Sequence, residues 1–284
     1  MSPAGPPIEF VGLGAQKAGT TSLWEALVAQ PWFAGGPTKE LRYFTANHHR
    51  GVDWYLAQFP PARAGLVRGE ISPDYLWDRE APGRMWRHNP GLRMVAVLRD
   101  PIERARSAYA HGQRVRAIPR GMSFEDVVRL ETAQQGRLWF VLVRGGLYFR
   151  QLSRYLEHFP REQLHVLLFE DLIDPAGPAL ADALRFVAAG AGPTVPLTLP
   201  HVNAGRAPAS LGRWRLERSA ERALRRGQPE RAERLLQRAR RVAVRSTAPP
   251  VLSEATRRML LERFAPENAA LADLLGIDLS AWER

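Results

Sequence analysis

The segment Ile8–Ser22 decides the fold, because an apolar run, Ile8–Leu13 (IEFVGL), leads into the turn Gly14-Ala-Gln-Lys-Ala-Gly-Thr-Thr-Ser22. A short apolar run that ends at a glycine is typical of a buried strand. After the turn, Thr20–Gln30 carries apolar residues at helical spacing, which predicts a helix. A helix that begins directly after a strand and a glycine turn presents free backbone N–H groups. The segment therefore predicts an anion-binding site.

The chain up to residue 187 repeats this order of strand and helix. Further strands are predicted at Leu66–Ile71, Arg93–Leu98 and Leu164–Phe169. Helices are predicted for about a dozen residues from Pro101 and at Phe124–Glu131 and Leu147–His158. Strands that alternate with helices build a parallel sheet covered on both faces. We therefore expect an α/β fold of the P-loop nucleotide-binding type, an α/β/α sandwich with a central parallel sheet and a C-terminal helical extension.

The expected extension follows a loop-like stretch, Gly190–Pro200. Two helices are predicted near 211–226 and 230–244, and a last helix at 253–275. We expect one domain over 1–284, composed of an α/β core at 8–187, an Arg-rich helical insert at 206–245 and a C-terminal helix at 253–275.

Composition limits the class of protein. The chain has 284 residues, of which 45% are apolar and 24% are charged, as in ordinary globular proteins rather than disordered or fibrous ones. It has no cysteine, which excludes disulfides and cysteine-ligated metals. No stretch has the composition of a transmembrane helix, and Met1–Pro7 does not have that of a signal peptide. We therefore expect a cytoplasmic protein without a membrane span.

The basic residues are almost all arginines, and they are distributed unevenly along the chain. Of 40 basic residues only two are lysines, Lys17 and Lys39, which suggests that these positions need a compact ammonium rather than a guanidinium. Residues 206–245 contain 13 arginines and four glutamates, a net charge of +9 out of +11 for the chain. This segment is either a solvated helical pair or a platform for an anionic acceptor or partner.

The glycine turn is similar to a known phosphate-binding loop. Gly14, Gly19 and Thr21 fit the P-loop pattern G-x-x-x-x-G-K-[ST], but Thr20 occupies the position of its lysine. The run from Gln16 to Leu23 closely resembles the 5′-phosphosulfate loop of sulfotransferases that use 3′-phosphoadenosine 5′-phosphosulfate (PAPS). The resemblance implies that the donor is bound by Gln16, Lys17, Ala18, Gly19, Thr20, Thr21 and Ser22.

A second motif resembles the segment that binds the 3′-phosphate in the same family. Within Val95–Tyr109, the resemblance assigns this phosphate to Arg99 at a strand end and to Ser107 in the following helix. Tyr148 belongs to a later matching block. No lysine follows Lys39, so the resemblance leaves Arg206, in Asn-Ala-Gly-Arg206, to take the part of the family's C-terminal donor-binding lysine.

Further blocks, Thr38–Phe44 and Gly69–Tyr75 among them, resemble the heparan-sulfate-type branch of these sulfotransferases. Thr38-Lys39-Glu40-Leu-Arg-Tyr-Phe44 matches the segment that carries the catalytic glutamate, which implies that Glu40 is the general base and that Lys17 stabilises the leaving phosphate. His111 and His201 are rival bases. Side chains considered for acceptor binding are Lys39, Glu70, Tyr75 and His111.

The expected reaction is sulfuryl transfer from PAPS to a hydroxyl or amine, with adenosine 3′,5′-bisphosphate (PAP) as product and no metal ion. The acceptor is expected to be a small molecule or a glycan. The alternatives are a P-loop nucleotide kinase or NTPase with an altered loop, and a non-enzymatic anion or nucleic-acid binder. The sequence contains no named nucleic-acid motif, so no nucleic-acid partner is expected.

Overall fold

The computed structural model of the chain describes residues 5–115, 117–119, 121–132, 141–174, 177–189, 216, 219–220, 223, 228–240 and 249–283. These residues form two compact units. The first comprises Met1–Asp100, Leu147–Val202 and Phe264–Arg284, and the second comprises Pro101–Gly146 and Asn203–Arg263. Each unit is described by itself below, and the single domain expected over 1–284 stays a prediction.

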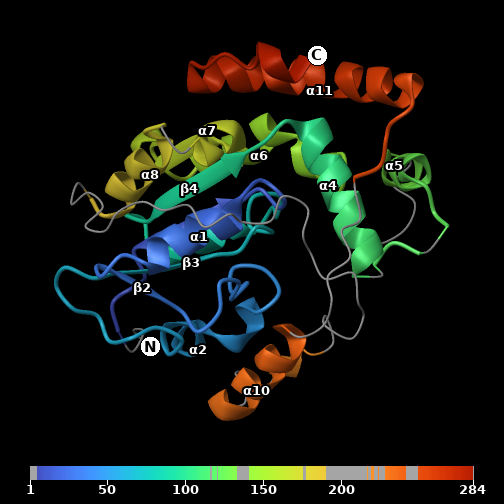
Figure 1. Ribbon diagram of the computed structural model, residues 1–284. Coiled ribbons are helices and arrows are strands. Elements are labelled where there is room, and N and C mark those ends of the chain that lie inside the picture. The colour runs from blue at the N-terminus through green and yellow to red at the C-terminus, as the bar shows by residue number, and fades with distance from the viewer. Residues whose placement is uncertain are drawn as a thin grey trace. The chain divides into compact units, whose positions relative to one another are not determined.

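The first unit contains a five-stranded parallel sheet with the order β2-β3-β1-β4-β5 (Figure 1). Its strands are β1 (Phe10–Gly14), β2 (Phe33–Gly35), β3 (Val67–Ile71), β4 (Arg93–Leu98) and β5 (Leu164–Leu168). Four of these strands confirm the apolar runs of the sequence. The edge strand β2 was not predicted, because three residues are too few to show a strand pattern.

Helices flank this sheet, which confirms the expected α/β class. Helix α1 packs against β2 and β3, whereas α8 packs against β4 and β5. The helices of the unit are α1 (Thr20–Val28), α2 (Val52–Leu56), α3 (Ala81–His88), α6 (Tyr148–Leu156), α7 (Phe169–Ile173) and α8 (Ala179–Val187). The predicted strand end at Phe169 is wrong by one residue, because Phe169 begins α7.

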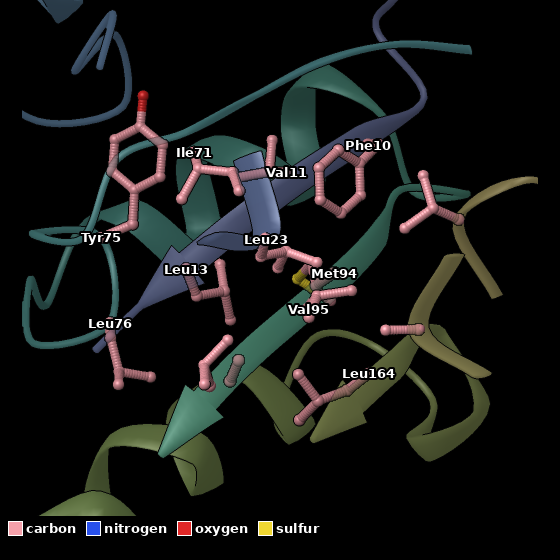
Figure 2. Packing of buried hydrophobic residues seen from close by; sticks show 14 of the residues in the cluster. Phe10, Val11, Leu13, Leu23, Ile71, Tyr75, Leu76, Met94, Val95 and Leu164 are labelled. Carbon is pink, nitrogen blue, oxygen red and sulfur yellow. The ribbon is translucent and has the colours of Figure 1, made fainter. Parts of the chain in front are cut away.

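The core lies on the central strands. All five residues of β1 are buried, as are all residues of β4 except Arg93, which explains why both strands are continuous apolar runs rather than alternating ones. Figure 2 shows side chains of β1 packed among those of β3, β4, β5 and α1. Burial on both faces fixes the register and hence the position of every strand end.

The second unit is helical in its described part. It contains α4 (Pro101–Arg114), α5 (Phe124–Thr132), the 3₁₀ turn Arg144–Gly146 and α10 (Pro229–Arg240). Ala232 and Leu235 of α10 pack against Ala220 and Ala223, as expected for a helical pair, although most of the predicted helix 211–226 lies outside the described residues.

The last long helix, α11 (Glu254–Leu275), agrees with the predicted helix 253–275. A short 3₁₀ turn at Ser280–Glu283 follows it. Among the helices that the structure describes, none is both long enough and apolar enough to cross a membrane.

Candidate active site

The glycine turn joins the carboxyl end of β1 to the first residue of α1. Gly14, Lys17 and Gly19 have φ angles of 136°, 72° and 91°, in the region that side chains rarely adopt. A Cβ atom at Gly19 would lie 2.8 Å from the ring of Phe169, so the turn needs glycine there for space as well. We call residues 14–22 the donor loop, after the resemblance described above.

The N-terminal end of α1 has the chemistry of an anion site. No acidic side chain lies in its first turn, and the backbone N–H groups there point out of the helix. Thr21 is exposed, whereas Thr20 and Ser22 are buried. The predicted loop residues are thus brought to one helix end, with Ala18 fully buried and Gln16 and Lys17 half-buried.

Arg99 follows the carboxyl end of β4, next to the donor loop. Its Nη1 donates a hydrogen bond to the carbonyl oxygen of Lys17 at 3.4 Å, and its guanidinium lies 4.6 Å above the centre of the Phe169 ring. The hydroxyl of Tyr148 donates to the carbonyl oxygen of Arg99 at 2.9 Å. The structure therefore brings Arg99 to the donor loop and Tyr148 to Arg99, at the carboxyl end of β4.

The remaining predicted donor and base residues are placed differently. Ser107 and His111 lie on α4 of the second unit, where His111 Nδ1 is hydrogen-bonded to Arg114. Arg206 and His201 lie outside the described residues. The roles expected for these four residues stay predictions.

Glu40 is linked to the donor loop by its neighbour Lys39. The Nζ atom of Lys39 donates to Thr20 Oγ1 at 3.0 Å and to Glu40 Oε1 at 3.3 Å. The Lys39 side chain is 16% exposed and that of Glu40 is 49% exposed. Arg42 forms an ion pair with Asp74, and its Nε lies 2.8 Å from Asp74 Oδ2. We call residues 39–44 the base segment.

Glu70 lies in the interior of the first unit. Its carboxylate is fully buried in β3 and accepts four hydrogen bonds. Oε2 accepts from the Leu41 amide at 3.3 Å and from Ser72 Oγ at 2.6 Å, and Oε1 accepts from the hydroxyls of Tyr55, at 3.4 Å, and Tyr75. Both Glu70 and Tyr75 were expected to contact the acceptor, and both are fully buried.

Burial raises the pKa of Glu70 from 4.5 to about 7. Hydrogen bonds from Ser72, Tyr75 and the Leu41 amide lower this pKa, and the nearby carboxylate of Asp74 raises it. The same burial, together with the Glu70 carboxylate, raises the pKa of the Tyr75 hydroxyl well above its usual 10. This buried network was not predicted, and its signal in the sequence is a glutamate within the strand segment VRGEI.

The part of the chain that the structure describes offers no cluster of three or more His, Asp or Glu side chains that could hold a metal ion. The candidate site described above consists of backbone N–H groups, hydroxyls, two lysines, one arginine and one carboxylate.

Comparison with known proteins identifies the family. The family model described as "Sulfotransferase domain" matches residues 9–187. Mouse heparan sulfate glucosamine 3-O-sulfotransferase 3B1 is 32% identical over 167 residues, which are 58% of this chain and 42% of that protein. Human heparan sulfate glucosamine 3-O-sulfotransferase 5 is 27% identical over 179 residues, 62% of this chain and 51% of that protein. The chain thus matches about half the length of these relatives.

A solved structure extends the likeness over the whole fold. The crystal structure of a sulfotransferase from Alicyclobacillus acidocaldarius superimposes with a TM-score of 0.68 at 26% identity, covering 98% of this chain and 99% of that one. The sheet, the donor loop and the base segment described above all lie within the matched family region. The chain belongs to the sulfotransferase domain family.

Proposed function

We propose that this protein transfers a sulfuryl group from PAPS to a hydroxyl or amine of an acceptor. The observation that carries the proposal is the position of the Lys39 ammonium, which bonds both the Thr20 hydroxyl of the donor loop and the Glu40 carboxylate. One cation thereby joins an anion site to a base. In-line transfer needs the donor and the acceptor to be held at such neighbouring groups.

The residues present fit the charge of the donor. The phosphosulfate end of PAPS is an anion, and the donor loop offers a helix N-terminus, the Thr20 and Thr21 hydroxyls and the Lys17 ammonium. The 3′-phosphate would be held by Arg99, whose planar guanidinium suits bidentate contact with phosphate. Ser107 is the second group proposed for this phosphate.

In the proposed reaction the acceptor gives up a proton to the protein, and an electron pair moves from the acceptor atom toward the donor. Glu40 takes the proton of the acceptor hydroxyl or amine while the acceptor atom bonds to sulfur. The bond between sulfur and the bridging oxygen breaks, and that oxygen keeps the electron pair on the 5′-phosphate. Lys17, the loop N–H groups and the threonine hydroxyls stabilise the added negative charge. A sulfuryl group carries less charge than a phosphoryl group, so the proposal requires no metal ion.

The acceptor is proposed to be a glycan or a small molecule with a free hydroxyl or amine. The similar mouse and human proteins are named for glucosamine in heparan sulfate, so glucosamine-containing glycans are the first acceptors to screen. Transfer of labelled sulfate from PAPS to such an acceptor is the direct assay.

Donor binding is tested by titrating PAP into the protein in a calorimeter, with and without magnesium. We expect binding that does not depend on the metal, and we expect Arg99→Ala to weaken PAP about 10- to 100-fold. Adenosine 5′-monophosphate lacks the 3′-phosphate, so the same substitution should weaken its binding far less. Equal weakening of both nucleotides would contradict the role of Arg99. Binding of ATP only with magnesium would favour the kinase or NTPase alternative.

A further inference from the structure

The buried Glu70 carboxylate takes no part in the acid–base chemistry proposed at the donor loop. It is fully buried, and among the described residues no Lys, Arg or His forms an ion pair with it. A buried carboxylate is expensive to desolvate unless its oxygens are fully hydrogen-bonded. Its four donors meet this requirement, and three of the four connect it to the base segment.

The connections reach the backbone of the base segment directly or through one hydroxyl. The Leu41 amide donates to Glu70 itself. The Arg42 amide donates at 2.9 Å to Ser72 Oγ, which in turn donates to Glu70. The Phe44 amide donates at 3.4 Å to the Tyr75 hydroxyl, which also donates to Glu70. Three amides within four residues therefore depend on one carboxylate.

The other side of Glu40 is fixed as well. The Ile71 amide donates to the carbonyl oxygen of Lys39 at 3.1 Å. Glu40 therefore lies between two neighbours, Lys39 and Leu41, whose backbones are both bound to residues at the end of β3. Little backbone freedom is left at Glu40 while these bonds persist.

The end of β3 is itself fixed to the strand that leads into the donor loop. Val11 pairs with Glu70 in the parallel register, and the Ser72 and Leu76 amides donate to the carbonyl oxygens of Gly12 and Leu13 at 3.1 and 3.0 Å. Figure 2 shows Ile71, Tyr75 and Leu76 beside β1. The base segment and the donor loop thus share one rigid support.

We propose that Glu70 is a positioning residue for the sulfuryl transfer, because its carboxylate holds the backbone of residues 41–44 so that Glu40 and Lys39 face the donor loop. The inference rests on the proposed function for the roles of Glu40 and Lys39. It assigns to Glu70 a part in transfer without any contact with donor or acceptor.

The groups around Glu70 make this support sensitive to pH. Its neighbours are the hydroxyls of Tyr55, from α2, and of Ser72 and Tyr75, from the turn after β3, with the Asp74 carboxylate close by. Tyr43 and His88 lie behind Tyr55, with ring centres 4.1 and 5.6 Å from it. Protonation turns one carboxyl oxygen into a donor, so the acid form cannot accept all four bonds equally well. The base segment should loosen as Glu70 takes up a proton.

The test compares Glu70→Gln with a matched control, Glu131→Gln. Glu131 is a buried glutamate of the second unit whose carboxylate accepts from the amides of Leu142, Val143 and Arg144 at 2.7, 2.9 and 2.8 Å. It differs from Glu70 in one respect, since Arg144 Nε lies 3.5 Å from its Oε1. We expect Glu70→Gln to lower kcat about 10- to 100-fold, as misplacement of a reacting group does, while the affinity for PAP changes less than about twofold. Glu131→Gln should leave kcat within about twofold.

Two further readouts separate positioning from a general loss of stability. Hydrogen exchange should become faster at the amides of residues 41, 42 and 44 in Glu70→Gln and stay unchanged in the donor loop. In the unmodified protein kcat should rise with pH near pH 7 as Glu70 loses its proton. This rise should be absent in Glu70→Gln. If Glu70→Gln does not fold, Tyr75→Phe is the second variant. It removes the hydroxyl that joins the Phe44 amide to Glu70, and with it one of the four hydrogen bonds to Glu70, while the links to the Leu41 and Arg42 amides remain. Exchange should then become faster at the Phe44 amide.

Equal losses of kcat in the two glutamine variants, or unchanged exchange in the base segment, would overturn the inference. Hydrogen exchange needs no turnover. Absence of sulfuryl transfer in the unmodified protein would therefore count against the proposed function, while the exchange result still decides the role of Glu70.

Discussion

The base segment, residues 39–44, and the end of β3, residues 70–75, each carry one glutamate, and the two glutamates have opposite surroundings. Glu40 is half exposed and paired with Lys39, whereas Glu70 is fully buried among hydroxyls and one amide. The exposed carboxylate can reach a substrate, and the buried one can only act through the protein. In the proposed reaction, a carboxylate near a strand end can therefore act in two ways: it can touch the substrate, or it can hold the backbone of the residues that do.

The largest effect that separates the two glutamates is expected for Glu40→Gln. The amide keeps the size of the side chain but cannot accept the acceptor proton, so kcat should fall about 10²- to 10⁴-fold. PAP affinity should stay close to that of the unmodified protein, since Glu40 does not bind the donor. Single-turnover assays with labelled PAPS and calorimetry with PAP measure the two quantities, and near-normal turnover would remove Glu40 from its proposed role.

A smaller effect is expected for Lys39→Met, which removes the ammonium that joins Thr20 to Glu40. We expect kcat to fall about 10- to 100-fold, because one pre-aimed donor is lost while the base is kept. Arg42→Met is the comparison, since it removes a cation of the same segment that pairs with Asp74 and attracts Glu40 only at longer range. If both substitutions lower kcat to the same extent, the Lys39 contact has no special part in transfer.

The smallest difference is one of stability rather than rate. The pKa of Glu70 is raised to about 7 in the folded chain, so between pH 4.5 and 7 the folded chain keeps a proton that the unfolded chain releases. The free energy of unfolding should therefore fall with rising pH across this window, by about 3 kcal/mol relative to Glu70→Gln, and stay level above it.

Urea denaturation of both proteins at pH 5 and pH 8 measures this difference. Burial lowers the pKa of His88 to about 4, which makes stability rise with pH as this histidine loses its charge, but the contribution is common to both proteins and cancels. If the two proteins differed in their free energy of unfolding by the same amount at pH 5 and at pH 8, Glu70 would be ionised at both. The expected dependence of kcat on the protonation of Glu70 would then be absent too.

Much of the fold could be predicted from single segments of sequence. The bounds of β4 agree with the run RMVAVL, because a strand buried on both faces must be apolar along its whole length. The donor loop could be placed for a similar reason, since glycines at 14 and 19 mark positions with positive φ. The short edge strand β2 and the five-residue helix α2 left no such pattern.

The candidate site could be predicted only where one segment carries its own signal. The resemblance located Glu40, and the choice of lysine over arginine pointed to Lys17 and Lys39. The contact between Lys39 and Thr20, by contrast, depends on how β2 and β3 bring two distant segments together. Glu70 was expected at the acceptor because it lies near a strand end, and only the fold reveals that its carboxylate is directed at the Leu41 amide.

The ring of Phe169 lies against both the bend at Gly19 and the guanidinium of Arg99. One hydrocarbon surface at the start of α7 therefore underlies the two places assigned to the opposite phosphates of a single nucleotide. The ring bounds one place by its bulk and the other through a cation–π contact, so it links the two places. A smaller side chain at position 169 would leave room for a bulkier residue at position 19. It would also remove the surface that lies under the Arg99 guanidinium. The selectivity for the nucleotide would then change at both phosphates together.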